Sequence, residues 1–152
     1  MTDTSHEIRT LNALIASVID SVDGYSESAK DVDSPQFSEK FLAWANERRE
    51  VSEKLRGQVT RLGGKPEDDG TILAAGHRAF VNLKSTVLSR DDKAVVNEVE
   101  RGEDHLKAKF EAALKDDNLS PSTREAVQSA WTSVQQGHDE MSRLKDSMER
   151  SA

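Results

Sequence analysis

The chain has 152 residues, of which 35% are hydrophobic and 32% are charged, and this length suits one ordinary domain. It contains no run of about 18 apolar residues that could span a bilayer, and no cysteine for a disulfide or a thiolate metal site. Its formal charge of −7 opposes binding to nucleic acids and to anionic membrane surfaces.

The first predicted helix covers residues 5–32. Residues 1–7 have neither a basic segment nor an apolar segment, so we expect no secretory signal and a cytoplasmic protein. Thr4 and Glu7 occupy the positions of a capping box, in which the two side chains cap the first helical turn. Apolar residues then recur every three or four positions, which places them on one helical face. This face consists of Ile8, Leu11, Ile15, Val18, Val22, Tyr25, Ala29 and Val32.

The second predicted helix covers residues 35–62. Ser34 suits the N-cap and Pro35 suits the first helical position, where a missing N–H has no cost. The helix is expected to stop at Gly63-Gly64, two residues before a proline. Because the link between the first two helices is very short, we predict an antiparallel helical hairpin.

Two further long helices are predicted over residues 91–115 and 121–149. Apolar residues follow helical spacing in both, and a tight turn at residues 116–118 joins them into a second hairpin. The apolar residues are Val95, Val96, Val99, Leu106, Phe110, Ala113 and Leu114 in one helix, and Val127, Ala130, Val134, Gly137, Met141, Leu144 and Met148 in the other.

The connection between the hairpins is long, and a fifth, shorter amphipathic helix is predicted within it over residues 71–89. A bundle whose third helix runs parallel to its second needs a crossover as long as the bundle itself. We therefore predict an all-α, ferritin-like four-helix bundle that forms one domain over residues 1–152.

Several segments spread along the chain have a specific order and spacing: Leu11–Ile15, Asp23–Tyr25, Arg61–Asp68, His77–Arg78, Asn82–Ser85 and Glu98–Asp104. In these segments the chain resembles a family of bacterial ferritin-like four-helix-bundle proteins that is labelled only as a domain of unknown function. The resemblance extends from about residue 8 to about residue 145, and it implies the ferritin-like fold without an established activity, substrate or cofactor.

Four residues are candidate metal ligands: Glu47, Glu100, Glu103 and His138. A ferritin-like di-iron site requires inward carboxylates on two helices and a Glu-x-x-His pair on each of the other two, and this chain has no Glu-x-x-His. At about 100° per residue, Glu103 faces the core, His138 leans inward, and the other two candidates border their apolar faces. The first helix offers no clear ligand.

A polar network in the core is the alternative to a metal site. Arg48 occupies an inward position between Trp44 and Val51, so it could pair with Glu103 across the core, with the Tyr25 hydroxyl nearby. Pairing would leave no buried charge without a partner.

The sequence therefore leaves two hypotheses open. In the first, the chain is a non-catalytic bundle protein with a structural, interaction or stress-related role, which self-associates as a homodimer or higher oligomer and needs no cofactor. In the second, it is a divergent carboxylate and histidine protein of the ferritin-like class that binds iron or manganese. Neither hypothesis assigns a catalytic residue.

Overall fold

The computed structural model describes residues 4–70 and 91–151, which form four long helices and, within these ranges, no strand. The helices are α1 (Thr4–Asp31), α2 (Pro35–Arg61), α4 (Asp92–Leu114) and α5 (Pro121–Ser151). Each boundary lies within two residues of its predicted position. The predicted helix over residues 71–89, with its His77, lies outside the described residues. Within the described ranges, no helix has an 18-residue window apolar enough to cross a membrane.

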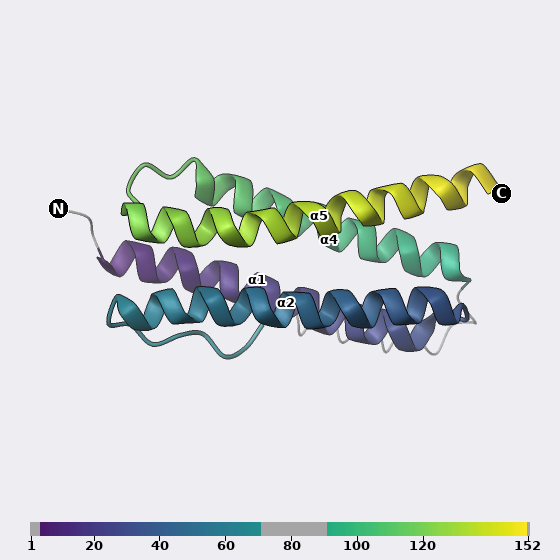
Figure 1. Cartoon of the computed structure of the whole chain (residues 1–152), viewed down its shortest axis with the longest axis horizontal. Helices are drawn as coiled ribbons and strands as arrows, with labels where there is room; N and C mark the ends of the chain where they lie inside the picture. The colour runs from purple at the N-terminus through teal and green to yellow at the C-terminus, as the bar shows by residue number, and fades with distance from the viewer. Residues whose placement is uncertain (1–3, 71–90, 152) are drawn as a thin grey trace.

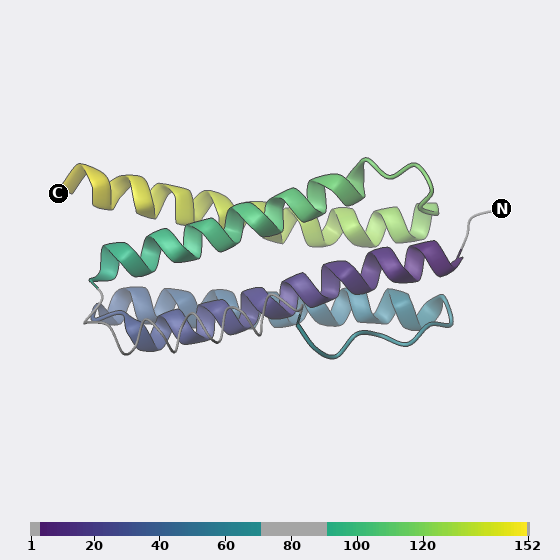
Figure 2. The ribbon, with the colours of Figure 1, turned by 180° about the vertical axis from the view of Figure 1, so that it is seen from behind.

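The four helices form two antiparallel hairpins that pack side by side (Figure 1). The α1–α2 hairpin meets the α4–α5 hairpin through the pairs α1–α4 and α2–α5, so α2 and α4 lie diagonally opposite each other. Helix α2 ends at one end of the bundle and α4 begins at the other end, as Figure 2 shows from behind. The two helices therefore run parallel, which confirms the predicted ferritin-like topology.

The helix ends follow the local signals in the sequence. Ser34 Oγ accepts a hydrogen bond from the backbone N–H of Phe37 at 3.3 Å, and Pro35 is the first residue of α2. Asp91 caps α4 in the same way, accepting from the N–H of Ala94 at 2.8 Å. Gly63 follows α2 with a φ of 84°, a left-handed conformation that glycine adopts without steric cost.

Glu7 caps a different helix from the one that the sequence predicted. Its carboxylate is buried and accepts a hydrogen bond from the backbone N–H of Ser120 at 2.5 Å, directly before α5 begins. Burial by itself raises the pKa of Glu7, but hydrogen bonds from Ser120 and Thr123 outweigh it and lower the pKa below its ordinary value. A carboxylate at this position also interacts favourably with the positive end of the α5 dipole.

The buried apolar residues form two clusters along the bundle, and a polar layer separates them. One cluster contains Leu11–Val18 of α1 and reaches Val51–Val59, Leu106–Ala113 and Val127–Val134 on the other three helices. The second cluster contains Tyr25, Ala29, Phe41, Ala45, Val95, Val96, Val99 and Met141. The helix segments between these clusters hold the candidate site.

Candidate functional site

One residue from each helix forms the layer between the two apolar clusters. These residues, here called the central layer, are Ser21, Arg48, Glu103 and Gly137. Each of these four positions continues the inward-facing apolar pattern of its helix, so its residue faces the interior of the bundle. The central layer is where bundles of this class place their ligand and metal sites.

Arg48 and Glu103 form a buried ion pair across the α2–α4 diagonal of the bundle. Arg48 Nη1 donates to Glu103 Oε1 at 2.8 Å and Arg48 Nη2 donates to Glu103 Oε2 at 2.7 Å. The side chains are 0% and 2% exposed. Parallel hydrogen bonds between a guanidinium and a carboxylate are among the strongest side-chain contacts in proteins. Each charge is therefore fully matched at the centre of the molecule.

Helix α1 adds two hydrogen bonds to this pair, while the buried Arg48 Nε has no hydrogen-bond partner among the described residues. Arg48 Nη1 also donates to Ser21 Oγ at 2.8 Å, and the Tyr25 hydroxyl donates to Glu103 Oε1 at 2.9 Å. Burial and the negative charge of Glu103 raise the pKa of Tyr25 well above its ordinary value of 10.0. Tyr25 is thus held as a neutral hydrogen-bond donor to the Glu103 carboxylate.

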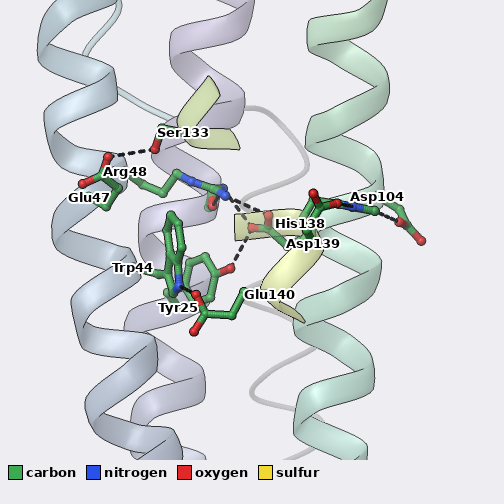
Figure 3. A network of polar contacts seen from close by, with 11 residues as sticks. Tyr25, Trp44, Glu47, Arg48, Asp104, Ser133, His138, Asp139 and Glu140 are labelled. Carbon is green, nitrogen blue, oxygen red and sulfur yellow. Dashed lines mark hydrogen bonds and ion pairs between the residues drawn. The ribbon is translucent and has the colours of Figure 1, made fainter. Parts of the chain in front are cut away.

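Two aromatic rings lie close to the guanidinium, both on the same side of it in Figure 3. Arg48 Cζ lies 5.6 Å from the centre of the Tyr25 ring and 5.5 Å from the centre of the Trp44 ring, within the range of cation–π attraction. The indole N–H of Trp44 donates to Glu140 Oε2 at 2.9 Å, and Lys40 Nζ lies 2.6 Å from Glu140 Oε1. Burial alone raises the pKa of Glu140, but these two hydrogen bonds outweigh it, so the pKa is lowered. Glu140 thereby stays ionised and fixes the Trp44 ring.

Gly137 gives the guanidinium its space on the α5 side. A Cβ atom at this position would overlap Arg48 Nη2, and it would lie 3.2 Å from the Trp44 ring and 3.3 Å from Glu103 Oε2. A glycine inside a long helix costs about 1 kcal/mol relative to alanine. The close approach of Arg48 explains why a glycine stands here despite that cost.

The structure divides the four candidate ligands among three places. Glu103 is bound to Arg48, as described above. Glu47 accepts a hydrogen bond from Ser133 Oγ at 2.8 Å, between α2 and α5. Glu100 and His138 lie together with a third residue, Asp104, and one ligand atom from each of these three falls within 4.8 Å of the others.

We call Glu100, Asp104 and His138 the flank cluster, because they join α4 to α5 at a position where Asp104 is exposed. Figure 3 shows Asp104 and His138 of this cluster. His138 Nε2 lies 2.7 Å from Asp104 Oδ1, and the Asp104 side chain is 57% exposed. Lys145 Nζ lies 3.5 Å from Glu100 Oε2. Asp104 was not among the predicted ligands, although its i, i+4 spacing from Glu100 places the two carboxylates on one face of α4.

The central layer does not fit the di-iron centre that a ferritin-like fold implies. Such a centre needs several free inward carboxylates and histidines. Glu103 is the one carboxylate of this layer, and both of its oxygens accept hydrogen bonds from Arg48. The space beside Glu103 already holds a cation, so a metal ion there would meet a positive charge and a single carboxylate.

Comparison with known proteins agrees with this fold. Residues 6–116 match the model of the family described as "Domain of unknown function (DUF2383)". The structure is similar to that of the bacterioferritin-related protein from Bacteroides fragilis, which is described as a dodecameric thioferritin. The TM-score is 0.77 at 13% sequence identity, over 99% of this chain and 90% of that chain. No curated protein shows significant sequence similarity to the chain.

Proposed function

The chain belongs to the DUF2383 family, and we propose that it is a non-catalytic bundle protein with a structural, interaction or stress-related role in the cytoplasm. One observation carries the proposal: the Arg48–Glu103 pair fills the central layer and matches both buried charges. Both Glu103 oxygens are occupied by hydrogen bonds from Arg48, so the pair offers no open ligand position and no free base. The centre of the bundle then serves to hold four helices together.

Metal content tests this proposal directly. Protein purified without chelator should contain less than about a tenth of an equivalent of any transition metal in the central layer, because a bound metal would have to displace Arg48. Elemental analysis of the wild type and of Glu103→Gln shows whether any metal is bound in the central layer, because only a metal held by Glu103 is lost on this substitution. Stoichiometric metal in the wild type that disappears in Glu103→Gln would refute the proposal.

Self-association is the second part of the proposed function. Its support is the structural similarity to a protein described as dodecameric. Most soluble oligomers consist of identical subunits arranged with closed symmetry, which suits an assembly of copies of this chain. The net charge of −7 disfavours nucleic acid and an anionic membrane as partners. Light scattering should give the mass of a homodimer or a larger assembly. A monomeric mass across micromolar concentrations would exclude this part.

A second candidate function is the binding of iron or manganese by the flank cluster. The observation that favours it is the approach of two carboxylates and one imidazole within 4.8 Å, between α4 and α5. Oxygen and nitrogen ligands of this kind suit Mn²⁺ and Fe²⁺. Glu100 and His138 would contribute together with Asp104, while Glu47 and Glu103 would stay in their present contacts.

Thermal unfolding distinguishes this candidate from the first. A specific metal stabilises the folded state and raises the melting temperature, so Mn²⁺ or Fe²⁺ should raise that of the wild type and not that of Asp104→Ala or His138→Ala. Glu111→Gln, which changes another exposed carboxylate on α4, is the matched control and should keep the full response. An equal response in all four proteins would show non-specific binding and exclude the site.

A further inference from the structure

We propose that the central layer is a guanidinium site: the Arg48 side chain is its resident cation, and the site prefers a planar guanidinium to a divalent metal ion. The inference deepens the proposed function, since it rests on a metal-free centre and states which cation the centre accepts instead. Its consequence is that a chain lacking the Arg48 side chain should bind free guanidinium at this position.

The polar contacts match the shape of a guanidinium. The two Glu103 oxygens accept from two different nitrogens of Arg48, Nη1 and Nη2, at 2.8 and 2.7 Å. Ser21 Oγ accepts a further hydrogen bond from Nη1 at 2.8 Å. A planar group with N–H donors on two neighbouring edges satisfies all of these acceptors together. A spherical ion would be held by one carboxylate, and by hydroxyls that are weaker ligands.

Two aromatic rings lie within cation–π distance of the guanidinium. The Tyr25 and Trp44 rings lie 5.6 and 5.5 Å from Arg48 Cζ, so both can attract a weakly hydrated, delocalised cation. Divalent metal ions hold their hydration water strongly and gain little from an aromatic face. The Trp44 ring is itself fixed by Glu140, which is the acceptor of its N–H. The aromatic surroundings therefore favour the organic cation.

Gly137 determines how much space the site has. Arg48 Nη2 lies where a side chain at position 137 would begin, and Glu103 Oε2 is 3.3 Å from the same point. A methyl group there would take the volume of one guanidinium nitrogen. Gly137 thus acts as a positioning residue for the ion pair.

The test is rescue of Arg48→Ala by free guanidinium. In low millimolar guanidinium chloride, far below denaturing concentrations, the melting temperature of Arg48→Ala should rise by about 2–5 °C. Equal concentrations of sodium chloride or urea should not raise it, and Mn²⁺ or Fe²⁺ should not raise the melting temperature of Arg48→Ala/Asp104→Ala, in which the flank cluster is also broken. The wild type and Arg49→Ala, whose arginine is exposed on the neighbouring position, should show no rise with guanidinium.

Two further variants connect the rescue to the site. Arg48→Ala/Glu103→Gln should lose the rescue, because it lacks the carboxylate that receives the guanidinium. Arg48→Ala/Gly137→Ala should show a smaller rise than Arg48→Ala, because the added methyl group occupies part of the site. If Arg48→Ala does not fold alone, millimolar guanidinium should restore its helical circular dichroism.

The proposal is overturned if guanidinium gives neither a melting-temperature rise nor a restored helical signal, or if the rise persists in Arg48→Ala/Glu103→Gln. It is also overturned if Mn²⁺ or Fe²⁺ stabilises Arg48→Ala/Asp104→Ala, which lacks the flank cluster, as much as guanidinium stabilises Arg48→Ala. If the wild type is metal-free and guanidinium does not stabilise Arg48→Ala, this inference is wrong but the proposed function stands. A metal lost from wild type on Glu103→Gln substitution would instead remove the proposed function.

Discussion

Glu103 and Asp104 are neighbours in the sequence, but one carboxylate is buried in the core and the other is exposed to solvent. The Glu103 side chain is 2% exposed and bound to a fully buried Arg48, whereas Asp104 is more than half exposed beside His138 on the flank of the bundle. One residue turns a helix by about 100°, which is enough to move a carboxylate from the core to solvent. The central pair must stay complete because its charges are desolvated, while water can replace either partner in the flank cluster.

The largest expected effect comes from breaking the central pair. Glu103→Ala leaves the Arg48 charge buried without a partner and should lower the free energy of unfolding by about 3–5 kcal/mol. Chemical denaturation measures this loss. Replacing both partners, as in Arg48→Met/Glu103→Leu, should cost less than the single change because no charge remains buried. A loss below about 1 kcal/mol in Glu103→Ala would show that the centre is as tolerant as a surface pair.

A smaller loss is expected when the space for Arg48 is filled. Gly137→Ala adds a methyl group against Arg48 Nη2 and should cost about 1–3 kcal/mol, although alanine is the better helix former. Gly102→Ala is the matched control, because a Cβ there meets nothing within 4 Å and α4 is helical on both sides. That control should gain up to about 1 kcal/mol in unfolding free energy. Equal gains in both variants would contradict a role for Gly137.

The titration of Tyr25 probes the environment of Glu103 in the unmodified protein. It is the single tyrosine of the chain, so phenolate absorbance isolates it. Because its folded pKa is raised, the folded protein should show little phenolate at pH 10.0, the ordinary pKa. Its contribution to stability should be present below that pH and decline above it, where the unfolded state loses the proton more readily. Glu103→Gln should lower the Tyr25 pKa, and an unchanged pKa would mean that the carboxylate has no influence.

The smallest effect is expected in the flank cluster. Asp104→Asn, in the presence of a chelator, should change the unfolding free energy by no more than about 0.5 kcal/mol, since the Asp104 side chain is 57% exposed and water can replace its contact. Denaturation under the same conditions as for Glu103→Ala gives a direct comparison. A loss as large as that of Glu103→Ala would remove the distinction between the two regions.

Part of the candidate site followed from helical periodicity. The angle of about 100° per residue placed Arg48 and Glu103 inside, and matching of buried charges made them partners. The same estimate left Glu47 and Glu100 at the borders of their helical faces. A border residue turns toward whichever neighbouring helix offers a partner, and periodicity along one helix carries no information about that neighbour.

Other contacts depend on which helices are adjacent. Asp104 was missed because it lies outside the apolar face of α4, and its partner His138 comes from α5. Glu7 has the spacing of a capping box, but its carboxylate caps α5, more than a hundred positions away in the chain. The role of Gly137 is visible only where Arg48 of α2 reaches across to it.

The sequence by itself determined the four described helices, their ends and the ferritin-like topology, because periodicity, capping residues and loop lengths act over short stretches of chain. The tertiary structure decided which cation occupies the bundle centre and which carboxylates remain on the flank. These outcomes depend on side chains from helices that are far apart in sequence. Only packing brings Ser21, Arg48, Glu103 and Gly137 into one layer, where desolvation makes a complete ion pair necessary.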